Sequence, residues 1–450
     1  MKRWETAGVM TELSGWGRYP VVEGSERVSE NFEAATRGAV LSRGLGRSYG
    51  DASLPVSPSD PVAASRRADR LLSFDPASGR LRAEAGLSLR GLNQIFLRRN
   101  WAAPVVPGTQ YVTLAGMVAS DVHGGNHHVA GTFGEHVRAL RMRVADGRVL
   151  EVSLDSEPEL FLATLGGMGL TGHILEVEVQ LERIPSPWIY QESRRVNDID
   201  DLVESLLEGS KQWPLTKTWF DSTTRGPRMG RGILITGRWA EPGEAPPQAP
   251  ELRERLSVPF ELPWSAVNGL TVSVFNMLWF HSQRRGLQSE VVHPQAFFWP
   301  LDGVRHWNRL YGPRGFAQYQ CVLPIERDTR VVRRFFAVMT KRGCPSPVSV
   351  IKDCGREGRG LLSFPKPGIS IALDVPLRRG EKTQALVDAL NEIVLDAGGR
   401  IYLAKDVLTR ADHYRAMEPR LAHWNEVRRK WDPDHKLRSA LSVRLLGDEP

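Results

Sequence analysis

The stretch PGTQYVTLAGMVASDVHGGNHHVAGTFGEHV, residues 107–137, combines many glycines with a cluster of histidines. Glycine lets main-chain N–H groups approach a ligand without an intervening Cβ, and consecutive N–H groups can form a concave anion site. The stretch therefore predicts either a metal site built on histidine or a backbone cradle for a phosphorylated group. Four of the eleven histidines of the chain lie in it: His123, His127, His128 and His136.

The arrangement of these histidines disfavours a metal site. His123 and His127 are four residues apart, which on a helix would place both rings on one face. The glycines between residues 124 and 131 disfavour a helix, and the loop offers no obvious Asp or Glu as a third ligand. We therefore expect no bound metal and assign His123 a polar role beside a ligand. Structural hydrogen bonding is expected for His127, His128 and His136.

Two further stretches are rich in glycine, RGLGRSYGD (43–51) and TLGGMGLTGHI (164–174). Each alone is explained equally well by ordinary turns, but together with 107–125 they could hold a diphosphate. The common nucleotide fingerprints do not fit. After Gly44 and Gly46 a dinucleotide motif requires a third glycine where the chain has Tyr49, and no GxxxxGK[ST] loop occurs. A phosphate cradle of another kind is expected.

Length and composition indicate a globular protein of two domains. The chain has 450 residues, 41% hydrophobic and 25% charged, with a formal net charge of +7. That excess suits anionic small molecules or an anionic membrane surface, and no nucleic-acid motif accompanies it. The N-terminal residues show no secretory signal, so we expect a cytoplasmic protein. Free thiols are expected at the three unpaired cysteines, Cys321, Cys344 and Cys354.

The hydrophobic pattern predicts an α+β fold rather than a doubly wound parallel sheet. Residues 70–86 and 137–153 alternate as β-hairpins, with turns at Gly79 and at Asp146-Gly147. Helical spacing appears at 88–100, 198–213 and 381–398, and most of the last fifty residues are expected to be helical. Strands are expected at 316–324, 347–355 and 368–377.

One segment, residues 262–283, contains no Asp, Glu, Lys or Arg. Its length approaches that of a membrane span, but Pro263, Asn268, Asn276 and His281 interrupt it and no other span accompanies it. We expect a buried helix or an apolar flap. The alternative is a patch on the membrane surface, with Arg284 and Arg285 beside the lipid headgroups.

Four motifs follow one another along nearly the whole chain: LSRGLGRSYGDASL (41–54), the stretch 107–137, ATLGGMGLTGHILEVEV (163–179) and GGRIYLAKD (398–406). Together they resemble the vanillyl-alcohol-oxidase type of FAD enzyme, which has the PCMH-type FAD-binding fold. Within this superfamily the chain is most similar to the decaprenylphosphoryl-β-D-ribose 2-oxidase branch. The resemblance implies an FAD-binding domain of residues 1–185, completed by 400–450, and a cap domain of 186–399 built on an antiparallel sheet.

The resemblance also implies which residues contact FAD. They are Arg43, Gly44, Gly46, Arg47, Ser48, Tyr49, Gly50, Gly108, Thr113, Leu114, Ala115, Gly116, Ser120, His123, Ile174 and Tyr402. Arg47 stands where many relatives carry a histidine covalently attached to the flavin, so we expect non-covalent FAD. Lys405, His123 and Tyr49 are the implied catalytic residues. For Lys405 the competing interpretation is a surface ion pair with Asp406.

The strands of the expected cap domain carry polar residues on one face. Gln318 and Gln320 are two residues apart and share a face, as do Lys352 and Cys354. By resemblance this face lines the substrate pocket, with Lys352 as a phosphate partner, although an exposed polar face would show the same pattern. Ring-stacking surface is expected from Trp219 and Tyr311.

The chain departs from the ribose-oxidase pattern at two places near this pocket. Ala372 stands where the branch typically has a cysteine, and Gly125 where a lysine often follows the histidine-glycine pair. The expected reaction is oxidation of a secondary hydroxyl of a sugar, linked as a pentose to a polyprenyl phosphate. Two partners are implied: a quinone or oxygen as electron acceptor, and an NAD(P)H-dependent short-chain reductase that would complete an epimerisation.

Three other functions remain open on the sequence alone. The first is a soluble alditol, aldonolactone or hydroxy-acid oxidase with the same flavin fold, which would need neither lipid nor membrane. The second is a histidine-metal hydrolase, and the third is a non-redox binding module for anionic ligands. The visible spectrum of the purified protein separates the flavin enzymes from the other two.

Overall fold

The computed structural model describes residues 10–251, 256–325, 329–378 and 381–450. The N-terminal part begins with a mixed sheet in the order β1-β2-β4-β3, in which β1 and β2 are antiparallel and β4 is parallel to both of its neighbours. Its strands are β1 (Met10–Ser14), β2 (Val21–Val28), β3 (Leu41–Arg43) and β4 (Pro61–Ala64), and the short helix α1 (Phe32–Ala35) precedes β3. Strand β3 therefore ends where the first glycine-rich loop begins.

A second, fully antiparallel sheet has the order β5-β6-β10-β8-β9. Both predicted hairpins are confirmed, because Gly79 and Gly147 turn the chain with φ angles of 77° and 92°. The strands are β5 (Leu71–Asp75), β6 (Arg80–Glu84), β8 (Val137–Arg143), β9 (Val149–Ser153) and β10 (His173–Gln180). The helices of this part are α2 (Leu89–Phe96), α3 (Leu114–Ala119), α4 (His127–Ala130) and α5 (Pro158–Thr164), and β7 (Trp101–Ala102) pairs with β11 (Glu182–Arg183).

Two antiparallel sheets follow and meet edge to edge. The first, in the order β13-β14-β12-β16, comprises β12 (Ile189–Val196), β13 (Leu215–Phe220), β14 (Gly232–Trp239) and β16 (Gln288–Val292). The second, in the order β19-β20-β18-β21, comprises β18 (Phe316–Leu323), β19 (Ser349–Cys354), β20 (Gly368–Pro376) and β21 (Arg400–Ile401). At the junction the Thr218 hydroxyl accepts from the Ile351 N–H and donates to the Ile351 carbonyl, each at 2.9 Å. A side chain thus joins the two sheets where no backbone ladder does.

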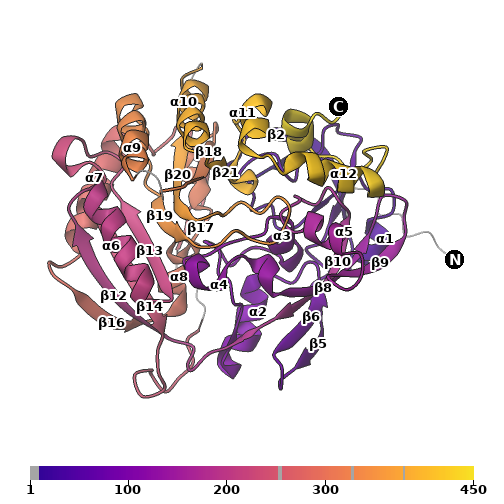
Figure 1. Cartoon of the computed structure of the whole chain (residues 1–450), viewed down its shortest axis with the longest axis horizontal. Helices are drawn as coiled ribbons and strands as arrows, with labels where there is room; N and C mark the ends of the chain where they lie inside the picture. The colour runs from indigo at the N-terminus through magenta and orange to yellow at the C-terminus, as the bar shows by residue number, and fades with distance from the viewer. Residues whose placement is uncertain (1–9, 252–255, 326–328, 379–380) are drawn as a thin grey trace.

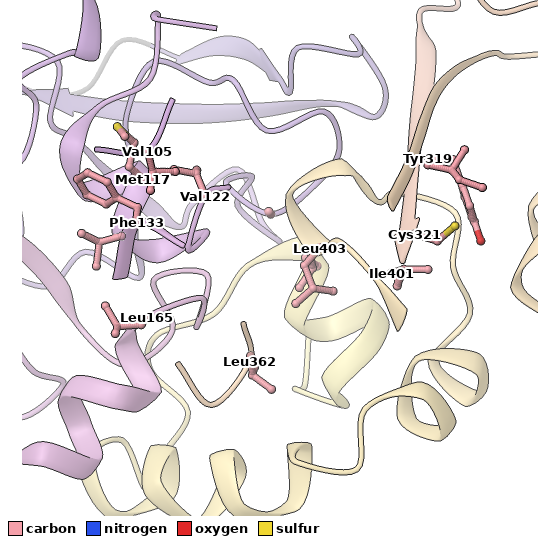
Figure 2. Packing of buried hydrophobic residues seen from close by; sticks show 14 of the residues in the cluster. Val105, Met117, Val122, Phe133, Leu165, Tyr319, Cys321, Leu362, Ile401 and Leu403 are labelled. Carbon is pink, nitrogen blue, oxygen red and sulfur yellow. The ribbon is translucent and has the colours of Figure 1, made fainter. Parts of the chain in front are cut away.

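Helices cover one face of this joined surface. They are α6 (Ile199–Gln212), capped by the Asp198 carboxylate, α9 (Arg330–Arg342) and α10 (Lys382–Asp396). Alternate residues of β18, such as Tyr319 and Cys321, are buried on the helix side, and Figure 2 shows both projecting to the same side of the strand. The intervening residues, Gln318 and Gln320, therefore face the N-terminal part of the chain.

The C-terminal helices return to the N-terminal part, as Figure 1 shows for the yellow segment beside α5. They are α11 (Ala411–Met417) and α12 (Leu421–Trp431). The Trp424 indole donates to the Ala163 carbonyl at 2.9 Å, and Arg444 forms ion pairs with both Asp51 and Asp406. The segment that carries Lys405 is thereby fixed against the first 185 residues. The three cysteines are free and buried, as expected.

The uncharged segment forms an exposed helix, α7 (Gly269–Ser282), which Figure 1 places at the outer edge of the joined sheets. The expectation of a buried helix is wrong, since only Val272 and Asn276 of this helix are buried. Asn276 explains the attachment, because its amide donates to the Asp221 carboxylate at 2.9 Å. Within the described ranges, every helix is too short or too polar to cross a membrane. Nearby are α8 (Pro294–Phe298) and the parallel pair β15 (Leu256–Ser257) and β17 (Val304–Arg305).

Candidate active site

The glycine-rich segments converge on the start of α3. A Cβ on Gly44 would lie 2.5 Å from the Thr113 hydroxyl, so only glycine lets this loop approach the helix so closely. Thr113 itself caps α3 by accepting from the Gly116 N–H at 3.2 Å. The third segment runs along the same helix, because the Met168 N–H donates to the Ala119 carbonyl at 2.8 Å. Three stretches spread over residues 43–174 thus enclose one region.

The C-terminal segment closes this region from the other side. The Tyr49 N–H donates to the Ala404 carbonyl at 2.9 Å, and a Cβ on Gly50 would lie 2.2 Å from the Asp406 carbonyl oxygen. Lys405, between these two contacts, is therefore held beside the first glycine-rich loop. Its Nζ lies 4.1 Å from the centre of the Tyr49 ring.

Arg43 and Arg47 have different surroundings in this loop. The Arg43 guanidinium is fully used within the protein, by an ion pair with Glu26 and by hydrogen bonds to the Ser14 carbonyl and the Ser53 hydroxyl. Arg47 instead stacks on the ring of Trp16, at 3.9 Å from its centroid, and its buried Nε has no protein partner. Of these two arginine side chains, Arg47 is the one with a polar atom available to a ligand.

Several buried polar atoms along these segments lack protein partners. They are Arg47 Nε, both amide atoms of Gln110, His123 Nδ1 and Gln318 Oε1. Leaving one buried polar atom unsatisfied costs about 1–3 kcal/mol, so such a set is expected where a polar group binds. An open cavity of about 420 Å³ adjoins the loop at Gly46 and Trp16. A large cofactor with polar edges fits this arrangement.

The remaining predicted cofactor residues differ in burial and in their contacts. Leu114 and Ile174 are buried, and the N–H groups of Leu114 and Ala115 are already bonded to main-chain carbonyls. Gly108 is exposed with open space around it. The Tyr402 hydroxyl donates to the Ser120 carbonyl at 2.9 Å, which ties the C-terminal segment to the end of α3.

The polar face of the second sheet lies opposite. In the ladder Gln318 pairs with Asp374, Gln320 with Ala372, and Lys352 with Ser370. Paired residues share a face, so these side chains and Cys354 project together, as the alternation of the sequence predicted. Burial lowers the pKa of Lys352, and among the interactions found around its amine there is no carboxylate. A half-buried ammonium of this kind is suited to an anionic substrate group.

His123 is the polar residue that meets this face from the N-terminal side. Its Nε2 lies 2.7 Å from the Gln320 amide nitrogen, and its ring contacts the rings of Phe364 and Tyr402. Burial, followed by the nearby charge of Lys352, lowers the pKa of His123 well below the usual value, so the ring is neutral. The prediction that His123 lies in a polar site is consistent with this position.

The other histidines are held by main-chain groups. His127 Nδ1 accepts from the Gly355 N–H at 3.0 Å, while His128 and His136 bond to the carbonyls of Trp213 and Ala130. In the described part of the chain, no three His, Cys, Asp or Glu side chains gather as metal ligands would.

Lys405 is partly buried, and burial together with the neighbouring Lys352 lowers the pKa of its amine to about 7, although Asp374 acts in the opposite direction. Asp406, the predicted surface partner, is instead bound by Arg444 at 2.9 Å. With a pKa of about 7 the amine is partly free at neutral pH, and an amine of this kind, close to a neutral histidine and a second lysine, has the chemistry of a general base.

Asp374 is a site residue that the sequence analysis missed. Its carboxylate is fully buried and accepts from the Tyr311 hydroxyl at 2.7 Å and from the Gln318 amide at 2.6 Å. Burial raises its pKa above the ordinary value. The available signal was a single charge in the otherwise apolar strand GISIALDVPL.

The two aromatic residues predicted to stack on substrate have different positions. Tyr311 is buried, and its ring stacks on Phe316 with centroids 3.9 Å apart, so it supports Asp374 from behind. Trp219 is partly exposed on β13, and its indole donates to the Pro347 carbonyl at 3.3 Å.

The two departures from the ribose-oxidase pattern also have structural settings. Ala372 lies on the polar face beside Gln320. At Gly125 any Cβ would lie 2.4 Å from the Thr216 carbonyl oxygen, so the lysine found in relatives does not fit this backbone.

Comparison with known proteins agrees with this geometry. Residues 23–153 match the FAD binding domain family. The chain is 33% identical to decaprenylphosphoryl-beta-D-ribose oxidase of Mycolicibacterium smegmatis over 96% of this chain and 97% of that protein. It is 32% identical to an uncharacterized protein of Streptomyces coelicolor over 80% of this chain and all of that protein. L-gulonolactone oxidase of Mus musculus is 31% identical over 34% of each chain.

The chain therefore belongs to the FAD-linked oxidoreductases of the vanillyl-alcohol-oxidase superfamily, in the family of decaprenylphosphoryl-β-D-ribose oxidase. It has the α+β, PCMH-type FAD-binding fold, and it is an FAD-dependent oxidoreductase.

Proposed function

We propose that the protein oxidises a secondary hydroxyl of a sugar, and that the sugar is a pentose linked to a polyprenyl phosphate. The observation that carries this proposal is the cluster formed by Lys405, His123, Gln320 and Lys352 at one face of the second sheet. It combines a base, a neutral hydrogen-bond donor, an amide and a half-buried cation. The names of the sugar and sugar-lactone oxidases among the relatives support a carbohydrate substrate.

Each residue has a role in this proposal. FAD, when bound, supplies the acceptor for the hydrogen that leaves the alcohol carbon. Lys405 Nζ takes the hydroxyl proton, and the neutral ring of His123 donates from Nδ1 to the substrate oxygen. Tyr49 keeps its proton because burial raises its pKa, and its ring positions Lys405. Sugar contacts are assigned to Gln318, Gln320 and Trp219, and the phosphate to Lys352. Tyr311, predicted to stack on the sugar, is instead buried against Phe316 and supports the pocket through Asp374.

We also propose that FAD is bound without a covalent link. Arg47 occupies the position at which many relatives attach the flavin through histidine, and a guanidinium is not a nucleophile at physiological pH. The stacking of Arg47 on Trp16 and its unpartnered Nε support a role in non-covalent binding. Acid denaturation should release all the flavin into the supernatant, and yellow colour retained in the precipitate would contradict this.

The lipid part of the proposal draws on α7. Among the residues that the structure describes, ten of the eighteen exposed large hydrophobic ones lie between residues 256 and 287, including Trp264, Leu278 and Trp279. Apolar patches of this kind are uncommon on monomeric proteins unless they bind something. Arg284 and Arg285 are exposed beside them and suit anionic headgroups. We propose a cytoplasmic protein with peripheral contact to the inner face of the membrane, where a polyprenyl tail is accessible.

The product would be a ketone, so completing an epimerisation requires a separate NAD(P)H-dependent reductase. The reduced cofactor requires a quinone or oxygen as acceptor. Both partners are part of the proposal. We further propose the division into an FAD-binding domain, 1–185 with 400–450, and a cap domain, 186–399, which the return of α11 and α12 to the N-terminal part supports.

A soluble aldonolactone or alditol oxidase is the second candidate. Ala372 and Gly125 favour it, because both replace residues typical of the ribose-oxidase branch in or near the pocket. Anaerobic titration of the purified yellow protein tests both functions. Bleaching by a polyprenyl-phosphate pentose but not by free sugars supports the first, whereas bleaching by free alditols or lactones supports the second. A protein that binds no FAD, even when FAD is added, contradicts both.

A further inference from the structure

Asp374 is a buried carboxylate on the polar face of the second sheet, to which the turn carrying Lys405 is attached, and the proposed reaction gives it no role. Asp374 receives two side-chain hydrogen bonds, from Tyr311 and Gln318, and its own N–H donates to the Ser346 hydroxyl at 2.9 Å. Backbone and side chain are thus both fixed. A carboxylate held this firmly in the interior needs a nearby positive charge, because unpaired buried charges are strongly disfavoured.

Lys405 is positioned to supply that charge. Its turn is attached to the same sheet, since the Tyr402 N–H donates to the Gln320 carbonyl and the Lys405 N–H to the Tyr402 carbonyl, each at 2.9 Å. Aromatic contacts continue the connection. Lys405 lies over Tyr49, whose ring meets the edge of Phe316 at 5.7 Å, and Phe316 stacks on the same Tyr311 that holds Asp374.

The titratable groups around Lys405 and Asp374 are Lys352, His123, Tyr49, Tyr311 and Cys344. Lys405 is influenced by Lys352 and Asp374, and it in turn acts on His123. Asp374 is influenced by Tyr311, Gln318 and Lys405, and the Cys344 thiol donates to its main-chain carbonyl. Of the groups acting on Lys405, Asp374 is the negative one.

We propose that Asp374 is a positioning residue for Lys405, whose carboxylate, held by Tyr311 and Gln318, directs the lysine amine to the substrate hydroxyl and balances its ammonium form. This inference rests on the proposed function for its catalytic meaning, but the lysine–carboxylate pairing can be measured without any substrate. The carboxylate stabilises the ammonium, so removing it should free the amine at lower pH.

The test compares Asp374→Asn with the wild-type holoenzyme. Reaction of Lys405 with a small amine-specific reagent is followed by peptide mass spectrometry over a range of pH. In the variant the pH midpoint of Lys405 labelling should move down by about one unit or more. One pH unit corresponds to 1.36 kcal/mol of lost interaction between the carboxylate and the ammonium. Tyr311→Phe, which keeps the carboxylate but removes one donor, should give a smaller shift in the same direction. Tyr311→Phe also provides the test of the pairing if Asp374→Asn does not fold.

Asp353→Asn is the matched control. This strand carboxyl faces Ser210 and His128 instead, and its removal should leave the Lys405 midpoint unchanged. The pH profile of flavin reduction by substrate should shift in parallel with the labelling. An unchanged labelling midpoint in both Asp374→Asn and Tyr311→Phe overturns the inference even if the enzyme oxidises sugars. If the labelling midpoint shifts but the wild-type protein does not oxidise sugars, the inferred pairing of Lys405 with Asp374 is supported and the proposed function is contradicted.

Discussion

Gln320 fixes the proton of His123. The Gln320 amide nitrogen donates to the Ser370 hydroxyl at 3.0 Å and lies 2.7 Å from His123 Nε2, so this ring nitrogen must accept. Because the ring is neutral, its single proton resides on Nδ1, the atom that has no protein partner. Gln320 of β18 and Ser370 of β20 thereby leave the Nδ1 proton of His123 free to bind a ligand.

Gln320→Glu should reverse this arrangement. A carboxylate at position 320 requires a donor at His123 Nε2, which removes the proton from Nδ1 or makes the ring cationic. We expect flavin reduction by substrate to slow by about 10²-fold, since a positioned hydrogen-bond donor is lost. Rapid mixing under anaerobic conditions measures the rate. Gln320→Leu removes the hydrogen bond to His123 Nε2 but does not force the proton away from Nδ1, so its reduction rate should fall less. Equal rates in both variants would argue against the assigned tautomer.

Lys405→Met should abolish flavin reduction by substrate while FAD remains bound. Loss of a general base typically costs about 10²–10⁴-fold in rate. Lys341→Met, an exposed lysine of α9, provides the control and should behave like the wild type. The bound-flavin spectrum and the anaerobic reduction rate report the two properties separately. A normal rate in Lys405→Met removes this residue from the mechanism.

The pH dependence follows from the same lysine. Burial lowers the pKa of Lys405 to about 7, so the fraction of free amine, and with it the reduction rate, should increase as pH rises through about 7. Above that range a plateau is expected until other groups titrate. Pre-steady-state reduction at saturating substrate measures the profile. A reduction rate that falls as pH rises from about 6 to about 8, roughly one unit on either side of that pKa, would falsify the assignment of Lys405 as base.

Gly125→Ala should destabilise the protein. Its Cβ would lie 2.4 Å from the Thr216 carbonyl oxygen, and backbone must move to accept it, at a cost of about 1–3 kcal/mol. Gly243→Ala, where a Cβ has open space, is the control. Urea denaturation of both variants gives the free energies of unfolding. Equal stability would mean that the loop yields easily, and the lysine of relatives could then be accommodated.

Leu278→Glu should weaken binding to vesicles. Burying a leucine side chain contributes about 1.5–3 kcal/mol, so the partition coefficient should fall by about tenfold or more. Co-sedimentation with phosphatidylglycerol-containing vesicles, compared with purely zwitterionic ones, measures binding and its dependence on headgroup charge. Leu154→Glu, equally an exposed leucine but remote in sequence from α7, is the control. Wild-type protein that remains in the supernatant with both vesicle types would reject membrane contact.

Much of the fold could be predicted because its signals are local. Hairpins at Gly79 and Gly147 combine alternation with residues that adopt positive φ, and neither signal depends on distant contacts. For α7 the sequence did not decide between a buried helix, an apolar flap and a membrane-surface patch, because an apolar run normally indicates burial. The helix is attached through the hydrogen bond from Asn276 to Asp221, a long-range contact that the sequence does not reveal, and α7 itself is apolar on nearly every side.

For the candidate site, the sequence predicted the segments better than the individual side chains. A motif identifies which segments approach a ligand, but it does not distinguish side chains that meet the ligand from those used internally. Arg43 illustrates this, since Glu26 and two oxygen acceptors occupy its guanidinium. Asp374 was missed because a single charge in a strand does not reveal its partners, which are contributed by β18 and by the segment preceding it.

The contact between Tyr49 and Ala404 has a consequence for biosynthesis. The loop that begins at residue 43 leaves the ribosome long before residue 404 does, and its final neighbours do not yet exist. A nascent chain can complete the sheets near its start, but it cannot enclose a tricyclic ring until the segment carrying Lys405 has emerged. Loading of the cofactor must therefore come late in synthesis or after it, and truncation before residue 404 should yield colourless protein.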